Sequence, residues 1–297
     1  MDNVKYLIMF CFSILVCCNQ AKTKKQKTEK SVEIVLEKLW ETDTILKTCE
    51  AVRYNPKKNL IYVSNIGNVP PDAKDNDGSI SILDESGKVL NQNWVTGISA
   101  PKGSDFYKNT LYVTDVNEVV EIDIETGHVN NKHVVQDAVF LNDLSVDLNG
   151  DIFFTDSRGD RVLKLVNNKV SPWLDLIGIN PNGILVEKER VLVVSYSNGN
   201  LISIDKKTKK KDVLATGIVG GDGIVSIKEG YIVSTWQGEI FFVDRHLKNS
   251  KAIKILDTKA EKLNAADISI IPEKNILLVP TFFGNSVIAY KINTNYK

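Results

Sequence analysis

The chain has 297 residues, of which 43% are hydrophobic and 25% are charged, as in a soluble globular protein with a substantial core. It carries 37 Lys and Arg against 37 Asp and Glu, so its formal net charge is zero. Proteins that bind nucleic acids usually carry an excess of positive charge, and this balance therefore argues against a nucleic-acid partner.

The first residues are typical of an export signal. One lysine precedes an apolar run at residues 6–16, which is too short to span a membrane but fits the apolar region of a signal peptide. The run ends at Leu15-Val16-Cys17-Cys18 and is followed by lysine-rich polar residues. This pattern resembles a bacterial lipoprotein signal with Cys18 as the lipidated residue. Cys17 is the second candidate for lipidation, and an ordinary cleaved signal or an uncleaved anchor is the alternative.

The signal predicts three segments: a signal peptide at 1–17, a lipidated tether at 18–31 and a folded domain at 32–297. We therefore expect an exported protein held on a bacterial membrane by its lipid alone, at the outer membrane or the periplasmic face in a Gram-negative cell. Cys49 is the one cysteine left in the folded domain, which excludes an internal disulfide. The chain has no Cys-x-x-Cys motif or Cys/His cluster that would indicate structural zinc.

From residue 49 onward the chain repeats one plan six times. Each unit opens with a strand, continues after a short turn with a more apolar strand, and adds a third, alternating strand. The predicted opening strands lie at 49–55, 101–107, 141–148, 181–187, 221–227 and 265–271. The second strands lie at 59–65, 110–115, 151–156, 190–196, 230–236 and 275–281, and the third at 79–85, 119–125, 161–167, 200–206, 239–245 and 286–292. Weaker fourth strands are predicted at 133–138, 211–216 and 251–257.

The equivalent opening positions are occupied by Glu50, Lys102, Asn142, Asn182, Asp222 and Ala266, at intervals of 52, 40, 40, 40 and 44 residues. Four short strands in about 40–45 residues are typical of a propeller blade. The predicted fold is therefore all-β, a six-bladed β-propeller of four-stranded blades. A polar insertion at 67–78 explains the longer first interval. The last unit lacks a fourth strand, and the alternating segment 31–40 is predicted to supply it and close the ring.

The six opening residues are predicted to meet at one mouth of the central channel, because the first strand of every blade lines that channel. Glu50 and Asp222 offer carboxylates, and Asn142 and Asn182 offer amide oxygens. This set suits a hard divalent cation, above all Ca²⁺, with Mg²⁺, Mn²⁺ or Zn²⁺ as alternatives. Without a cation, the two carboxylates would repel each other and one would take up a proton. The alternative is that the Asn-Asp, Asn-Gly and Asp-Gly dipeptides are turns.

The ordered set of Glu50, Asn142-Asp143, Asn182-Gly183 and Asp222-Gly223 resembles the gluconolactonase/regucalcin (senescence marker protein) family of six-bladed propellers, over residues 45–292. The resemblance implies a divalent cation, often Ca²⁺, bound by Glu50, Asn182 and Asp222, with Asn142 binding the metal or the substrate. It also implies hydrolysis of a lactone or ester, in which the metal polarises the carbonyl and Asp222 is the candidate general base. The family's usual Arg-Phe-Asn-Asp motif reads Phe140-Leu141-Asn142-Asp143 here, so gluconolactone itself is not the expected substrate.

The loops between second and third strands are predicted to form the pocket wall, and they offer Asn65, Asp115, Asp156-Ser157-Arg158, Tyr196, Trp236 and Phe282-Phe283. Lys102 and Arg158 are candidate contacts for an anionic substrate. The alternatives are a surface salt bridge for Arg158 and pairing with Asp143 or Asp267 for Lys102. Trp236 and Phe282 are candidate apolar contacts, with packing between blades as the alternative. The insertion is interpreted as a solvated loop, with a lid as the alternative.

Two functions stay open on these grounds. The first is a monomeric, metal-dependent hydrolase acting on a small-molecule lactone or ester. The second is a non-catalytic propeller that binds a ligand or acts as a scaffold and keeps Ca²⁺ for structure alone, since a propeller by itself implies no catalysis. A third alternative is a condensing activity like that of strictosidine-synthase-like relatives.

Overall fold

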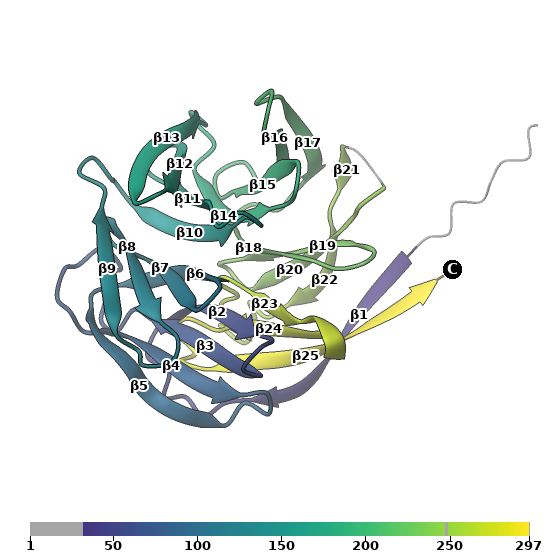
Figure 1. The fold of residues 1–297 in the computed structure, drawn as a ribbon. Helices are drawn as coiled ribbons and strands as arrows, with labels where there is room; N and C mark the ends of the chain where they lie inside the picture. Colours follow the sequence, from purple (N-terminus) through teal and green to yellow (C-terminus); the bar gives the residue numbers. More distant parts are fainter. Residues whose placement is uncertain (1–31, 247–248, 297) are drawn as a thin grey trace, which may run out of the picture. The chain divides into compact units, whose positions relative to one another are not determined.

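The computed structural model describes residues 32–246 and 249–296. Its strands form six small sheets arranged in a ring, and each sheet has an antiparallel four-stranded core (Figure 1). The one helix in these residues is a single short 3₁₀ turn, η1 (Pro272–Lys274). The predicted all-β, six-bladed β-propeller is therefore confirmed.

The first three blades follow the predicted order of inner, second, third and outer strand. Blade one contains β2 (Cys49–Asn55), β3 (Leu60–Asn65), β4 (Gly78–Asp84) and β5 (Val89–Ile98). Blade two contains β6 (Pro101–Tyr107), β7 (Thr110–Asp115), β8 (Glu118–Asp123) and β9 (Val129–Val134). Blade three contains β10 (Leu141–Val146), β11 (Ile152–Asp156), β12 (Arg161–Val166) and β13 (Lys169–Asp175).

The next two blades keep that order and are linked by a short extra strand. Blade four contains β14 (Pro181–Val186), β15 (Arg190–Ser195), β16 (Leu201–Asp205) and β17 (Lys211–Thr216). Blade five contains β18 (Gly221–Ser226), β19 (Gly230–Thr235), β20 (Glu239–Asp244) and β22 (Ile253–Asp257). Between β20 and β22, the chain adds β21 (Ser250–Lys251) in parallel to the outer strand β17 of blade four.

Blade six is assembled from both ends of the described chain. It contains β23 (Ser269–Ile271), β24 (Ile276–Pro280), β25 (Val287–Tyr296) and, on its outer edge, β1 (Val32–Glu41). β1 pairs antiparallel with β25 from Val32 opposite Tyr296 to Glu41 opposite Ile288. The prediction that the segment before blade one closes the ring is therefore confirmed.

The outer strand of blade two differs from the prediction. The outer strand of blade two is β9 at 129–134, whereas the sequence pattern favoured 133–138. The residues after it instead form the loop that leads into blade three, where Val139 and Phe140 bind the Asp156 carboxylate through their backbone N–H groups. The outer strand of blade four, β17 at 211–216, lies where it was predicted.

The core is a ring of apolar clusters that lie between neighbouring blades rather than at the centre. In the cluster between blades two and three, Val119 of blade two packs with Leu144 and Phe154 of blade three, and all three are fully buried. Second strands are buried on both faces, so they read as continuous apolar runs such as Val191–Val194 in β15. The centre is thereby left to polar side chains of the first strands.

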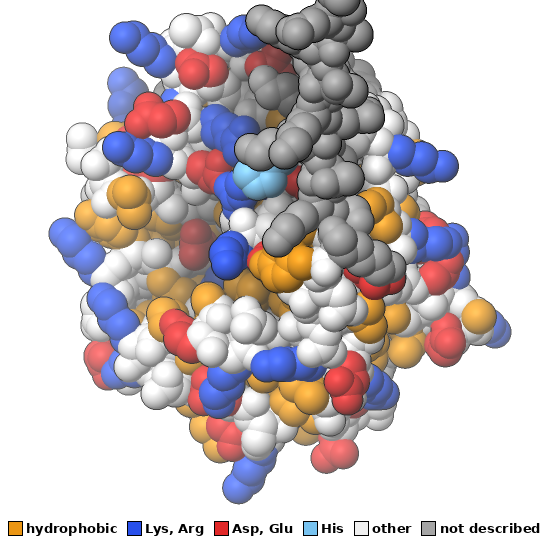
Figure 2. All heavy atoms as spheres, turned by 90° about the vertical axis from the view of Figure 1, so that its right-hand side faces the viewer, with side chains coloured by type: hydrophobic (Ala, Val, Ile, Leu, Met, Phe, Trp, Pro, Cys, Tyr) orange, Lys and Arg blue, Asp and Glu red, His pale blue; other side chains and the backbone are white. Residues whose placement is uncertain are grey.

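On the face drawn in Figure 2, basic and acidic side chains are interspersed around small apolar patches. Cys49 is a free, buried thiol, as the cysteine count predicted. Within residues 32–246 and 249–296, no helix has the length and hydropathy needed to cross a bilayer. The predicted signal peptide, Cys18 and the tether lie outside the described residues.

Candidate functional site

The predicted opening residues of blades one to five lie at local irregularities of the first strands. Where the first strand meets the second, the pairing register shifts in five blades, between Cys49/Ala51, Pro101/Ser104, Leu141/Leu144, Pro181/Ile184 and Gly221/Ile224. Such bulges bend a strand and re-aim the side chains at the bulge. The Asn-Gly, Asp-Gly and Asn-Asp dipeptides are therefore parts of strands β10, β14 and β18, and the turn alternative is wrong.

Glycine follows three of the opening residues because the first strands of neighbouring blades approach closely there. A Cβ added to Gly103 would lie 2.2 Å from Asp143 Oδ1, and one added to Gly183 would lie 1.7 Å from the Asp222 carbonyl oxygen. A Cβ on Gly223 would lie 2.4 Å from the backbone nitrogen of Ile268. These glycines let the opening residues of successive blades converge on the channel axis.

A cavity of about 300 Å³ lies at this mouth of the channel. Five opening residues line it and are each at most 7% exposed: Glu50, Lys102, Asn142, Asn182 and Asp222. We call these five residues the mouth ring. Ala266 of blade six is also buried there, but it packs in an apolar cluster with Ile66 and Phe282. The structure thus brings together all four residues predicted to bind a metal.

Two oxygen atoms of the mouth ring have no hydrogen-bond partner within the described residues, namely Glu50 Oε2 and Asn182 Oδ1. Leaving a buried acceptor unsatisfied costs about 1–3 kcal/mol, so such atoms point to a ligand. Burial raises the pKa of Glu50 to about 8, and the charge of Lys102 opposes that rise. Burial, together with the nearby Glu50 carboxylate, also raises the pKa of Asp222 well above its usual range.

The donor atoms of the mouth ring fit a hard cation. The described part of the chain contains no group of three or more His, Cys, Asp or Glu side chains that could hold a metal ion. A cation here would therefore need the amide oxygens of Asn142 and Asn182 as well as the carboxylates of Glu50 and Asp222. Oxygen-only sets that mix carboxylates and amides are the kind that Ca²⁺ prefers.

Lys102 is a buried cation without an ion-pair partner among the described residues. It is 1% exposed, and its Nζ donates a hydrogen bond of 3.1 Å to the Ala100 carbonyl and lies 4.8 Å from the centre of the Phe140 ring. Burial lowers the pKa of Lys102 to about 8, although Glu50 and other carboxylates favour its charged form. The predicted pairing of Lys102 with Asp143 or Asp267 is wrong, because no carboxylate of these residues lies within 4 Å of it.

The cavity wall has a cationic side and an aromatic side. Arg158 lies over the Phe140 ring, 4.2 Å from its centre, and pairs with Asp72 of the insertion at 3.0 Å. On the aromatic side, the ring of Trp236 packs edge-on against Phe282 at a centroid distance of 5.7 Å. All the predicted substrate contacts, Asn142, Lys102, Arg158, Trp236 and Phe282, line the cavity.

Three residues predicted for the wall have a structural role instead. Asp115 accepts hydrogen bonds from the backbone N–H groups of Ser99 and Ala100 at 2.9 and 2.6 Å. Asp156 binds the loop before blade three in the same way, and Asn65 Nδ2 donates to serines of its own blade. The two carboxylates thus fix the loop that enters their own blade, and none of the three side chains lines the cavity.

The cavity is also lined by residues that the sequence reasoning missed, among them Phe140, Asn180 and Pro71. Phe140 and Asn180 lie directly before the first strands of blades three and four. Residues just before the opening position therefore reach the cavity too, and the repeat alignment offered that signal. Pro71 comes from the insertion, which has no counterpart in other blades and so no signal of this kind.

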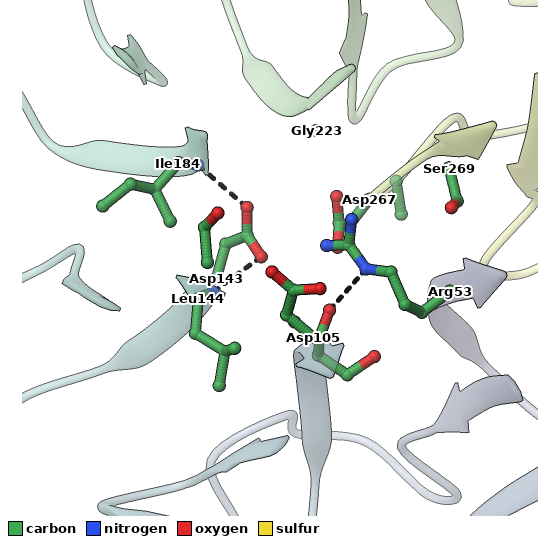
Figure 3. A network of polar contacts seen from close by, with 12 residues as sticks. Arg53, Asp105, Asp143, Leu144, Ile184, Gly223, Asp267 and Ser269 are labelled. Atoms are coloured by element: carbon green, nitrogen blue, oxygen red, sulfur yellow. Dashed lines mark hydrogen bonds and ion pairs between the residues drawn. The ribbon is translucent and has the colours of Figure 1, made fainter. Parts of the chain in front are cut away.

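A second polar group is formed by residues that lie one to three positions after the opening residues, and its side chains point toward one another at the centre of the ring (Figure 3). We call Arg53, Asp105, Asp143 and Asp267, which come from four blades, the channel cluster. Asp143 accepts hydrogen bonds from the backbone N–H groups of Leu144 and Ile184 at 2.7 and 2.8 Å, which links blade three to blade four. Arg53 donates to the Ser104 carbonyl at 2.5 Å and lies 3.8 Å from Asp267.

Comparison with known proteins identifies the fold and leaves the family open. No protein-family model matches the chain. No curated protein sequence matches it either. The resemblance to gluconolactonase and regucalcin is therefore not confirmed.

Three of the similar solved structures are lyases of low sequence identity. Virginiamycin B lyase from Staphylococcus aureus, made catalytically inactive by replacing a histidine with alanine and solved with quinupristin, aligns with a TM-score of 0.60 at 10% identity, over 88% of this chain and 99% of that one. A streptogramin B lyase structure gives 0.60 at 10% identity, over 88% and 98%. A selenomethionine form of the Staphylococcus aureus enzyme gives 0.58 at 12% identity, over 87% and 99%. Similarity at this level shows a shared propeller fold.

Proposed function

We propose that this protein is a divalent-cation-dependent hydrolase of a lactone or ester. One observation carries the proposal: four oxygen-bearing residues from four blades meet in one cavity, and two of their buried oxygens have no hydrogen-bond partner among the described residues. Glu50, Asn142, Asn182 and Asp222 would hold the cation, most of all Ca²⁺. When bound, the cation would polarise a substrate carbonyl and favour the negative charge that develops on its oxygen.

The protein's own residues supply the base and the walls. Asp222 is the candidate general base, which would take the proton of the attacking water on its carboxylate. Burial raises the pKa of Asp222 when no cation is bound, and a bound cation would lower it again and keep the carboxylate ionised, as a general base requires. Trp236 and Phe282 would exclude water on one side and contact an apolar part of the substrate.

The similar structures support an enzyme on this fold and differ in the chemistry of the site. They are named as lyases, and one of them is inactive without a particular histidine. No histidine is among the residues that line the cavity here. His133 instead pairs with Glu121 on the outer side of blade two, at 2.8 Å. Chemistry in this cavity would therefore depend on the carboxylates Glu50 and Asp222.

The proposal is tested by measuring cation binding and turnover together. Calorimetry with Ca²⁺, Mg²⁺ and Mn²⁺ would be combined with a panel of lactones and aryl esters, for the wild type, Glu50→Gln and Asp222→Asn. Loss of either carboxylate should weaken cation binding by more than about 100-fold, since even residues that only support a ligand are worth 10–100-fold. Asp212→Asn, at an exposed residue of the outer strand β17, is the control and should behave as the wild type.

Each outcome separates the candidate functions. Cation binding that survives both substitutions would show that the mouth ring is not the site. Cation binding that requires Glu50 and Asp222, without turnover of any substrate in the panel, would favour the second candidate. That candidate is a ligand-binding or scaffolding propeller with a structural cation.

A further inference from the structure

The insertion of blade one reaches over the cavity. It occupies residues 66–77 between β3 and β4, and both Ile66 and Pro71 line the cavity wall. Its base is held by Asp77, which accepts a hydrogen bond from the backbone N–H of Asn68 at 2.9 Å. Most of residues 68–77 are exposed, as expected for a solvated loop, and Pro71 also contributes to the cavity wall.

The tip of the insertion is tied to blade three by one charged contact. Asp72 Oδ2 lies 3.0 Å from Nη1 of Arg158, which belongs to blade three. Within the described residues, no other ion pair or side-chain hydrogen bond joins residues 70–75 to another blade. Both partners are partly exposed, at 41% and 54% of their side-chain area, so this contact can exchange with solutes.

The Asp72 carboxylate interacts electrostatically with two cations, Arg158 and Lys102. Arg158 and Lys102 both contact the Phe140 ring, at 4.2 and 4.8 Å from its centre. Asp72 also favours the charged form of Lys102, whose pKa burial lowers. Lys102 uses one hydrogen bond, to Ala100, and has no ion pair among the described residues. A buried ammonium with so few partners is costly unless an anion joins it.

The geometry points to the substrate class: we propose that the Asp72 carboxylate stands in for a carboxylate of the substrate. The cavity would then take a lactone or ester that carries a carboxylate group, held by Arg158 and Lys102. Its apolar part would lie against Trp236 and Phe282, and the insertion would release as Asp72 leaves Arg158. The ester part of this inference rests on the proposed function, whereas the anion preference does not.

The test compares an acid and a neutral amide of the same shape. Calorimetry would measure binding of 3-phenylpropanoate and 3-phenylpropanamide to the full chain in EDTA, so that no metal can bind the carboxylate. Removing the internal competitor in Asp72→Asn should tighten acid binding by about threefold, the scale of an exposed ion pair, and should leave amide binding unchanged. Arg158→Gln should weaken acid binding by about fivefold on the same scale.

The matched control is Asp75→Asn, which removes a charge from the same insertion at a residue that does not line the cavity. It should leave the binding of both compounds as in the wild type. In the double variant Asp72→Asn with Arg158→Gln, the gain from Asp72→Asn should disappear. The inference is overturned if the wild type binds acid and amide equally, or if Asp72→Asn tightens both compounds alike or neither.

Turnover separates this inference from the proposed function. A preference for the acid, with no hydrolysis of any ester, would leave the anion site standing and contradict the hydrolase. Hydrolysis of neutral aryl esters, with no preference for the acid in EDTA, would support the hydrolase and contradict the anion site.

Discussion

Two groups of buried charges come from the first strands, and they differ in how their hydrogen bonds and charges are satisfied. In the channel cluster, Asp143 accepts two backbone hydrogen bonds, and Asp267 Oδ2, which lacks a hydrogen bond, lies 3.8 Å from Arg53. In the mouth ring, by contrast, Glu50 Oε2 and Asn182 Oδ1 have neither a hydrogen bond nor an ion pair within the described residues.

The difference indicates which group is structural and which is functional. Charges that are satisfied by the protein itself hold the blades together and offer little to a ligand. Oxygen atoms that line a cavity without a hydrogen-bond partner can coordinate a cation. The contrast is sharp because both groups come from the same first strands, only a few residues apart.

The largest expected effect is a loss of stability on raising the pH in EDTA. Burial raises the pKa of Asp267 to about 7 and that of Glu50 to about 8, while Arg53 opposes the first rise and Lys102 the second. The folded state therefore binds more protons than the unfolded state between the ordinary pKa of these groups and the raised one. The free energy of unfolding should fall as the pH rises from about 4 to 8.

Saturating Ca²⁺ should separate the contributions of the two groups to this pH dependence of the free energy of unfolding. It should remove the contribution of Glu50 and Asp222, which a cation would keep ionised, and leave the contribution of Asp143 and Asp267. Urea unfolding at several pH values, with and without Ca²⁺, measures both contributions. A pH dependence that is unchanged by Ca²⁺, Mg²⁺ or Mn²⁺ would contradict a cation site in the mouth ring.

The next largest effect is expected from Asp143→Ala. It leaves the backbone N–H groups of Leu144 and Ile184 without an acceptor and removes the link between blades three and four. We expect a loss of about 3 kcal/mol in the free energy of unfolding, measured by urea denaturation. Asp222→Ala is the comparison in the mouth ring, and in EDTA it should cost less than about 1 kcal/mol because the Asp222 carboxylate accepts no hydrogen bond among the described residues. Equal losses would mean that the two groups do not differ as proposed.

The repeat made much of this arrangement predictable. A six-fold pattern of strands fixed the blades, and the common position of Glu50, Asn142, Asn182 and Asp222 placed them at one mouth without any knowledge of contacts. The closing strand β1 was predictable for the same reason. The repeat left blade six without a fourth strand, and the alternating segment before blade one could supply it. Features that recur once in each blade are therefore accessible from the sequence.

Features that occur in a single blade were not predictable. The pair of Asp72 and Arg158 joins residues 86 positions apart, and neither belongs to the repeat. The roles of Asp115 and Asp156 were missed because an acid at a strand end suits a pocket as well as a backbone clamp. The direction of the side chain decides between these two roles, and the pattern of strands in the sequence does not reveal that direction.

The smallest expected effect concerns Lys102, the one cation of the mouth ring. Its charge lies near Glu50 and should oppose a bound divalent cation, so Lys102→Met should tighten Ca²⁺ binding by about fivefold, the scale of a partly screened charge pair. The same variant should lose preference for 3-phenylpropanoate over its amide, because an anion contact is gone. Calorimetry measures both effects, and Lys132→Met, whose lysine pairs with Glu118 on the outer side of blade two, is the control. Weaker Ca²⁺ binding in Lys102→Met would mean that Lys102 supports the cation site instead of opposing it. The proposed difference between the mouth ring and the channel cluster would then fail.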